Sequence, residues 1–150
     1  MGIEKDINQA TFKSEYQKGM INIIYTHNWL KEKVQHFFDR EGLTTQQFNI
    51  LRILRGSKTP LSTLQIRERM LDKMSDTSRI VDRLVLKGLA KKGISKTDKR
   101  LVDVIISAKG KKLLEKMDYH ENEFEKLLQN LSEKEASTLN QLLDKIRQPH

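Results

Sequence analysis

The sequence predicts a mainly α-helical chain with a small β-hairpin (an α+β fold), in which a winged helix-turn-helix is flanked by long N- and C-terminal helices. Three observations predict this fold. Seven glycines and two prolines among 150 residues are fewer than the average of about 12%, so turns are few. Apolar residues near both ends recur every three or four positions, which is the period of a helix. The middle of the chain combines two short helical patterns with two short strand patterns.

The first long helix is expected at residues 11–39. Its apolar stripe comprises Phe12, Tyr16, Met20, Ile23, His27, Leu30, Val34 and Phe37, and Gly42 ends the helix. A second helix begins after Thr44, because Thr44 and Gln47 have the spacing of a capping box. This helix carries Phe48, Leu51 and Leu54, and it ends before Gly56 and Pro60.

A helix-turn-helix is expected next. Ser62 and Gln65 form another capping box, and the helix that follows runs through Met70 with Leu64, Ile66 and Met70 facing inward. After a break at residues 71–74, a further helix extends from Ser75 to Lys87 and buries Ile80, Val81 and Leu84. Gly88 closes this helix as its C′ residue. Two short helices with a tight turn between them are typical of the motif.

The period then changes to that of strands. Residues 89–94 and 101–106 are predicted to pair, with Val102, Val104 and Ile106 on one face. Between the strands lies a polar, basic tip at residues 95–100. A helix-turn-helix followed by such a hairpin is a winged helix, here residues 44–106.

The C-terminal part is expected to be helical again. Ser107 caps a helix whose stripe comprises Leu113, Met117, His120, Phe124, Leu127 and Leu131. Ser132 and Glu135 form a third capping box, and the last helix has an inner face of Ala136, Leu139, Leu142, Leu143 and Ile146.

We predict one continuous domain over residues 1–150, with 11–39 and 107–147 as dimerisation helices. Their wide apolar stripes have little domain body to cover, so a second copy of the chain is the expected partner. Packing within one chain is the alternative. A two-fold dimer would present two recognition helices to DNA half-sites about one helical turn apart.

Charge and composition restrict the partners. The net charge is +8, and residues 61–110 account for +6 of it through 12 basic and 6 acidic residues. An anionic partner is therefore plausible, although a solvated charged surface is the simpler alternative. Cysteine is absent, which excludes disulfides, thiolate metal sites and thiol-based sensing. Neither a membrane span nor a signal-peptide core is found, so we expect a soluble, cytoplasmic protein without membrane partners.

Two segments resemble the MarR family of bacterial transcription regulators. Residues 98–110 follow that family's wing signature, D-x-R-x-x-x-V-x-L-T-x-x-G, and residues 78–84 and 87–89 follow its patterns T-R-L-V-D-R-L and K-G-L. The departures at Ser78, Ala90, Ile106 and Ser107 are conservative. The resemblance implies a homodimeric DNA-binding regulator, usually a repressor, that is often released by a small molecule.

The candidate DNA-binding residues fall on the recognition helix and the wing tip. Arg100 suits a narrow minor groove, because a guanidinium is planar and weakly hydrated. Asp98 either orients Arg100, as the resemblance implies, or only stabilises the turn. Lys96 and Lys99 are expected to contact the phosphate backbone.

The recognition helix opens with Ser75, Asp76, Thr77 and Ser78, whose position at a helix N-terminus suits phosphate contacts. Arg79 and Arg83 lie four residues apart on one face, and we expect at least one of them to contact guanine edges in the major groove. In the alternative, one of the two arginines pairs with Asp76 or Asp82 and braces the fold instead.

An effector site is implied by the resemblance alone. It would involve Tyr16, Met20, Ile23, His27, Phe48 and Arg52, although each of these residues equally suits a core. Its ligand would be a small aromatic or lipophilic molecule. His27, His36, His120 and His150 are too scattered for a metal site, and we expect His27 and His120 to be hydrogen-bonded core or interface residues. We find no catalytic motif, so neither an enzyme nor a bound cofactor is expected.

The sequence therefore favours a sequence-specific DNA-binding regulator, with operator DNA and a second copy of the chain as partners. Two alternatives are an architectural DNA-coating protein of low specificity and a protein-interaction module. The two arginines on one helical face favour the sequence-specific regulator, because a protein that coats DNA needs mainly lysines.

Overall fold

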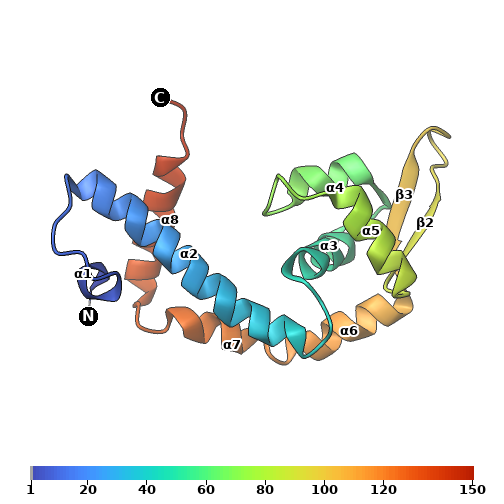
Figure 1. The fold of residues 1–150 in the computed structure, drawn as a ribbon. Helices are drawn as coiled ribbons and strands as arrows, with labels where there is room; N and C mark the ends of the chain where they lie inside the picture. Colours follow the sequence, from blue (N-terminus) through green and yellow to red (C-terminus); the bar gives the residue numbers. More distant parts are fainter. Residues whose placement is uncertain (1) are drawn as a thin grey trace. The chain divides into compact units, whose positions relative to one another are not determined.

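The computed structural model describes residues 2–150 (Figure 1). The chain forms two compact units, Met1–Thr45 and Gln46–His150. The first contains α1 (Ile3–Asp6) and α2 (Glu15–Asp39), and α3 (Thr45–Gly56) opens the second. As predicted, the fold is mainly helical with a small antiparallel sheet. In the part of the chain that is described, no helix has both the length and the apolar character needed to cross a membrane.

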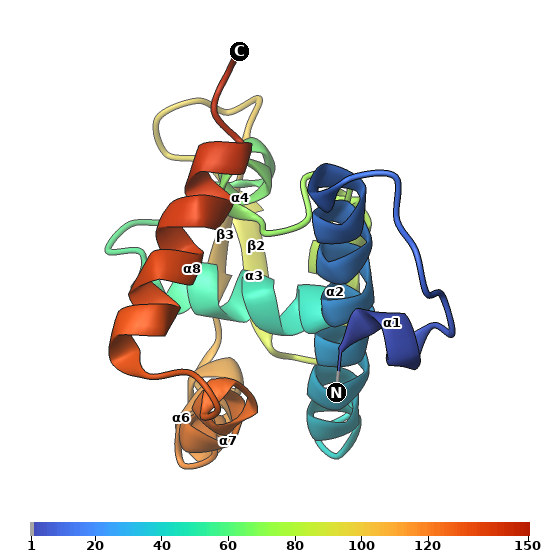
Figure 2. The same ribbon diagram turned by 90° about the vertical axis from the view of Figure 1, so that its left-hand side faces the viewer.

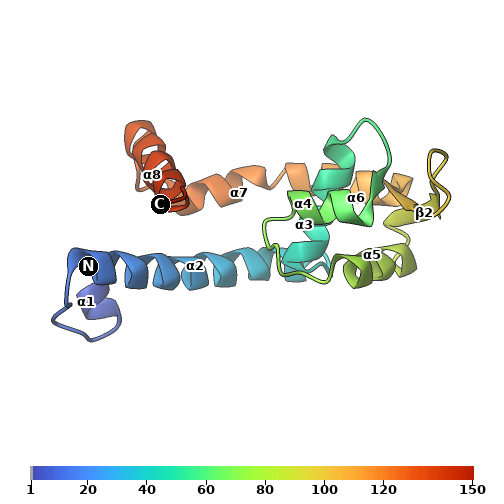
Figure 3. The same cartoon turned by 90° about the horizontal axis from the view of Figure 1, so that it is seen from above.

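In the first unit, α2 begins at Glu15, four residues later than predicted. Ser14 caps it, because the Ser14 hydroxyl accepts a hydrogen bond of 3.1 Å from the backbone N–H of Gln17. Phe12 therefore precedes the helix. The unpredicted α1 lies beside the first turns of α2 (Figure 3), where Lys18 forms an ion pair with Glu4.

The end of α2 is as predicted. Gly42 has a φ of +66°, and the N–H groups of Gly42 and Leu43 donate to the carbonyls of Asp39 and Phe38 at 3.2 Å. These two bonds define a Schellman motif, which requires the left-handed conformation that glycine adopts without strain.

The second unit contains the winged helix. The helices are α3, α4 (Thr63–Arg69) and α5 (Thr77–Leu86), and the strands are β1 (Leu61–Ser62), β2 (Ala90–Ile94) and β3 (Val102–Ile106). The sheet order is β1-β3-β2, and both pairs are antiparallel. Ala90 pairs with Ile106 and Ile94 with Val102, which confirms the predicted hairpin. The two-residue β1 was not predicted.

The core of this unit lies between the helices and one face of the sheet. Its most buried side chains are Ile50, Leu51, Leu61, Ile66, Met70, Val81, Leu84, Val104 and Leu114. One inward placement was wrong. Leu64 is 63% exposed, because Ile66 and Met70 share one side of α4 and Leu64 lies about 200° around the helix from Ile66. Val102 is 39% exposed at the outer end of the hairpin.

The C-terminal segment contains α6 (Ala108–Asp118), α7 (Glu121–Glu125), the 3₁₀ turn η1 (Lys126–Leu128) and α8 (Glu133–Ile146). The prediction of one helix through Leu131 was wrong, because the chain leaves the α-helical conformation at His120 (φ −104°, ψ 3°). The predicted caps are confirmed. Ser107 accepts from Gly110 N–H at 3.0 Å, and Ser132 and Glu135 form a capping box. Beyond it, α8 turns away from the line of α6 and α7 (Figures 1 and 2).

Candidate nucleic-acid interface

The recognition helix α5 is preceded by a turn that positions its first residues. The Asp72 carboxylate accepts from Met74 N–H at 3.0 Å, and the Asp76 carboxylate accepts from Arg79 N–H at 3.3 Å. Asp76 is thus the N-cap, and the helix starts at Thr77, two residues later than predicted.

The four candidate phosphate-contacting residues differ in exposure. Ser78 is exposed, whereas Thr77 is only 3% exposed. The hydroxyl oxygens of Ser75 and Thr77 are buried without a hydrogen-bond partner. All four residues line a groove of about 530 Å³, together with Thr63, Leu64, Arg67 and Met74. Ser78 is therefore the hydroxyl of this group that is open to solvent.

Arg79 and Arg83 project from one face of α5 into solvent. Within residues 2–150, neither guanidinium takes part in an ion pair or a side-chain hydrogen bond. The two carboxylates that were alternative partners are used elsewhere, since Asp76 caps α5 and Asp82 pairs with Lys92 at 2.6 Å. Bracing of the fold by either arginine is therefore not observed, and both side chains are available to a ligand.

The recognition helix is joined closely to the wing. Gly88 has a φ of +72°, and the N–H groups of Gly88 and Leu89 donate to Val85 and Leu84 at 2.9 Å in a second Schellman motif. The Ser107 hydroxyl donates to the Gly88 carbonyl at 2.6 Å. The ion pair of Asp82 with Lys92 connects α5 to β2 once more. The ion pair of Asp82 with Lys92 was not predicted, although the predicted turn at Gly88 brings the two elements together.

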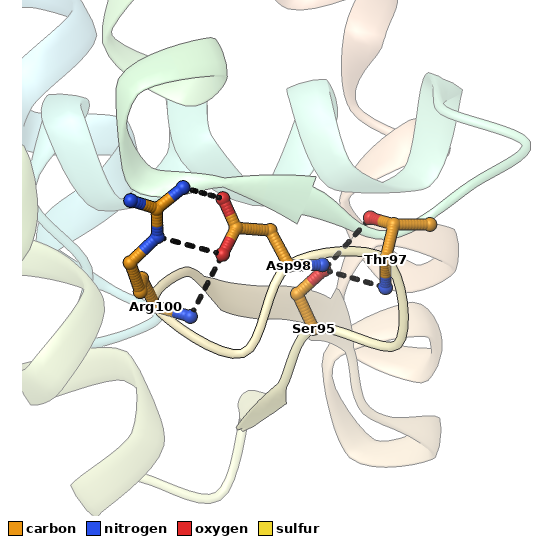
Figure 4. A network of polar contacts seen from close by, with 4 residues as sticks. All are labelled: Ser95, Thr97, Asp98 and Arg100. Carbon is orange, nitrogen blue, oxygen red and sulfur yellow. Dashed lines mark hydrogen bonds and ion pairs between the residues drawn. The ribbon is translucent and has the colours of Figure 1, made fainter.

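The wing tip holds Arg100 through Asp98 (Figure 4). The Asp98 carboxylate accepts from Arg100 backbone N–H at 3.0 Å, from Nε at 3.2 Å and from Nη2 at 3.3 Å. These bonds lower the pKa of Asp98, the side-chain bond contributing most. The side chain of Arg100 is nonetheless 90% exposed. Asp98 thus directs the guanidinium without withdrawing it from solvent.

Lys96 and Lys99 are exposed on either side of Asp98. Together with Arg79, Arg83 and Arg100 they give the outer surface of the winged helix an array of solvent-facing cations. Such an array attracts phosphates and releases counterions when it binds them.

The candidate effector residues are divided between the two units. Tyr16, Met20, Ile23 and His27 are exposed on α2, with Tyr16 91% exposed. On α3, the Arg52 guanidinium lies 5.8 Å from the centre of the Phe48 ring and 3.9 Å from Glu121. His27 and His120 are exposed, so neither is a core residue of the single chain. His120 is hydrogen-bonded as expected, with Nδ1 3.3 Å from Glu123.

Comparison with known proteins agrees with this geometry. The model of the MarR family matches residues 41–101, which cover the winged helix through Leu101. A MarR transcription factor from Planctomyces limnophilus has the same fold over 89% of this chain and 98% of its own, with a TM-score of 0.68 and 29% identity. Over the winged helix, the chain is therefore similar to the MarR family.

Two further solved structures share this fold. A variant of MarR from E. coli, complexed with operator DNA, has a TM-score of 0.74 and 24% identity over 85% of this chain and 92% of its own. BpsR from Bordetella bronchiseptica, whose DNA binding is regulated by 6-hydroxynicotinic acid, has a TM-score of 0.80 and 19% identity over 94% of this chain and 100% of its own. No curated protein sequence matches the chain.

Proposed function

We propose that this protein is a MarR-type, homodimeric, sequence-specific DNA-binding regulator that acts as a repressor and is released by a small molecule. The observation that carries the proposal is the set of three exposed arginines on two joined elements. Arg79 and Arg83 are free on α5, and Arg100 is directed by Asp98 on the wing. Guanidinium groups read guanine edges in the major groove and narrow A·T-rich minor grooves.

DNA binding is supported by the operator complex of the E. coli relative. Specificity is supported by the arrangement of the arginines, because a protein that only coats DNA has no use for a carboxylate that holds one guanidinium in a fixed direction. The repressor role is supported by the family resemblance. The dimer is supported by the resemblance and by the exposed apolar residues on α2 and α8.

The direct test is selection of binding sites from random duplex DNA, followed by competition with non-specific DNA. We expect an enriched two-fold symmetric site with A·T-rich flanks, bound about 10³-fold or more tightly than random DNA. Uniform binding of all sequences would indicate the architectural alternative. Absence of salt-dependent DNA binding would indicate the protein-interaction alternative.

Release by an effector is tested separately. Small aromatic carboxylic acids are suitable probes, beginning with 6-hydroxynicotinic acid because it regulates the relative BpsR. We expect one of them to weaken binding to the selected site and to raise the thermal stability of the free protein. Arg52→Gln removes the cation beside Phe48 and is expected to reduce both effects. If no acid of the series alters either quantity, release by this class of ligand is wrong.

A further inference from the structure

Ser95 is a buried residue in an exposed loop. It follows β2 at the base of the wing tip and is only 4% exposed, whereas Lys96, Thr97, Lys99 and Arg100 around it are exposed. Its hydroxyl oxygen accepts hydrogen bonds of 3.3 Å from the backbone N–H groups of Thr97 and Asp98. It also lies 3.1 Å from the Thr97 hydroxyl (Figure 4).

The backbone closes the loop at the same residue. Ser95 N–H donates to the Leu101 carbonyl at 3.1 Å, and Leu101 N–H donates to the Asp98 carbonyl at 3.0 Å. Asp98 is therefore held at both its N–H and its carbonyl. Its carboxylate in turn accepts three hydrogen bonds from Arg100. A continuous series of bonds thus runs from the Ser95 hydroxyl to the Arg100 guanidinium.

We infer that Ser95 is a positioning residue, whose hydroxyl fixes the backbone of Asp98 and thereby the direction in which Arg100 is presented to DNA. The inference rests on the proposed function and deepens it. Without the hydroxyl, the N–H groups of Thr97 and Asp98 lose their acceptor, and the loop samples conformations in which Asp98 and Arg100 no longer face each other. Such a loop must be ordered when DNA binds, which lowers affinity.

Three variants isolate this role. Ser95→Ala removes the acceptor. Ser95→Asn restores one, because an asparagine side chain accepts from the N–H two residues further along. Thr97→Val is the matched control, since it deletes the neighbouring hydroxyl and keeps both backbone bonds to Ser95.

The first measurement needs no DNA. In ¹⁵N NMR spectra of the free protein, the Arg100 Nε–H resonance is identified by its loss in Arg100→Lys, and its exchange with water is measured. We expect Ser95→Ala to move this resonance toward that of a solvated arginine and to accelerate its exchange. Thr97→Val should leave both quantities unchanged, and Ser95→Asn should restore them at least in part.

The second measurement uses DNA of the selected site. Ser95→Ala should weaken binding about 2- to 10-fold, the range for loss of a hydrogen bond, and it should reduce the preference for the A·T-rich flank. The loss should nearly vanish in an Arg100→Ala background, because Ser95 acts through Arg100. A merely structural role would weaken binding equally in both backgrounds.

The two measurements separate the inference from the proposed function. An Arg100 Nε–H signal that is unchanged by Ser95→Ala overturns the inference, as does an equal effect of Thr97→Val. If Ser95→Ala does not fold, the Arg100 Nε–H signals of Ser95→Asn and Thr97→Val are compared instead. A signal that is perturbed in Thr97→Val but not in Ser95→Asn contradicts the inference. Lack of DNA binding by the unaltered protein contradicts the proposed function while the NMR result stands.

Discussion

Asp98 places a negative charge in the wing tip, residues 95–100, whose other charged residues are Lys96, Lys99 and Arg100. The three hydrogen bonds that its carboxylate accepts come from Arg100, and they lower the pKa of the carboxyl. Asp98 is therefore ionised throughout the neutral range and neutralises none of the other cations. In the proposed function, this charge directs the Arg100 guanidinium toward DNA.

Substitution of this pair distinguishes direction from charge. Arg100→Ala should cost about 1–3 kcal/mol of binding free energy per half-site and flatten the preference at the flank. Asp98→Ala should also weaken binding, because Arg100 is no longer held. The double variant should be little weaker than Arg100→Ala alone. Binding is measured for all three variants across a salt series.

If only the total charge mattered, Asp98→Ala would bind more tightly, and more so at low salt. Tighter binding by this variant would therefore refute the orienting role. Lys96→Ala is a suitable control, because it removes one exposed cation and should weaken binding to all sequences alike.

Gly110 illustrates how closely two segments approach in the second unit. A Cβ atom at this position would lie 2.3 Å from the Leu89 carbonyl oxygen, which is far inside contact distance. We predict that Gly110→Ala lowers the free energy of unfolding by about 1–3 kcal/mol, the usual range for overpacking. Gly19→Ala is the control, because nothing lies within 4 Å of its Cβ position in α2, and it should stabilise by about 0.5–1 kcal/mol. Denaturant titrations measure both, and equal effects would contradict the prediction.

At the scale of elements, caps were predictable because they depend on residues three positions apart. The boxes at Ser62 and Ser132 are confirmed. The late start of α2 carries the same signal, since Ser14 and Gln17 repeat the spacing of Ser62 and Gln65. The helix was predicted to begin earlier because Phe12 continues the apolar spacing of α2 on the N-terminal side of Ser14.

Other elements left no such signal. Apolar residues recur every three or four positions from Leu113 to Leu131, and this spacing continues through the break in the helix at His120. The spacing is compatible with a tight turn as well as with a helix, so it did not indicate the break. The strand β1 has only two residues, too few for an alternating pattern. Asp82 pairs with Lys92 because β2 packs beside α5, and this packing is not visible in the sequence. The positions of Arg79 and Arg83 were therefore predictable, but the absence of an ion pair between either of them and Asp82 was not.

A bidentate ion pair connects α3 to the end of α6. Arg55 donates to Asp118 at 2.7 and 3.1 Å, and this hydrogen bonding lowers the pKa of Asp118. A carboxyl with a lowered pKa in the folded state stabilises the fold above its unfolded pKa of about 3.9. That contribution disappears as the pH falls through the folded value.

Asp118→Asn should therefore reduce the free energy of unfolding at pH 7 by about 1 kcal/mol or less, since both side chains are partly exposed. The difference from the unaltered protein should shrink as the pH is lowered below about 4. Urea titrations at several pH values measure it, and Arg55→Met should reproduce the effect. A difference that persists at the acid end would mean that the ion pair is not its source.

At the scale of the whole molecule, the apolar residues that a single chain leaves uncovered predict a dimer. On α8, Leu142 and Ile146 are 54% and 59% exposed, and α2 exposes Tyr16, Met20, Ile23 and Ile24. We expect light scattering at micromolar concentration to give twice the 17.6 kDa of one chain. Removal of residues 139–146 should weaken DNA binding, because a single half-site lacks the avidity of two.

Charged substitutions on the apolar face of α8 test which surface forms the dimer. Leu142→Lys combined with Ile146→Lys should dissociate the dimer and leave the helical content intact. Ser137→Lys adds the same type of charge about 140° around the helix from Leu142 and should leave the dimer unchanged. A mass near 17.6 kDa for the unaltered protein would refute the dimer.

Only Lys87, Gly88 and Leu89 separate the last residue of α5 from the first residue of β2. The tight turn at Gly88 therefore gives the recognition helix and the wing a fixed span. On a duplex, a span is counted in base-pair steps, each of which advances about 3.4 Å and rotates by about 35°. In the proposed complex, the number of base pairs between the bases contacted by α5 and the flank contacted by Arg100 is therefore fixed in each half-site. One base pair inserted between them carries the flank around the helix axis, and the insertion should abolish the flank preference as completely as the loss of Arg100.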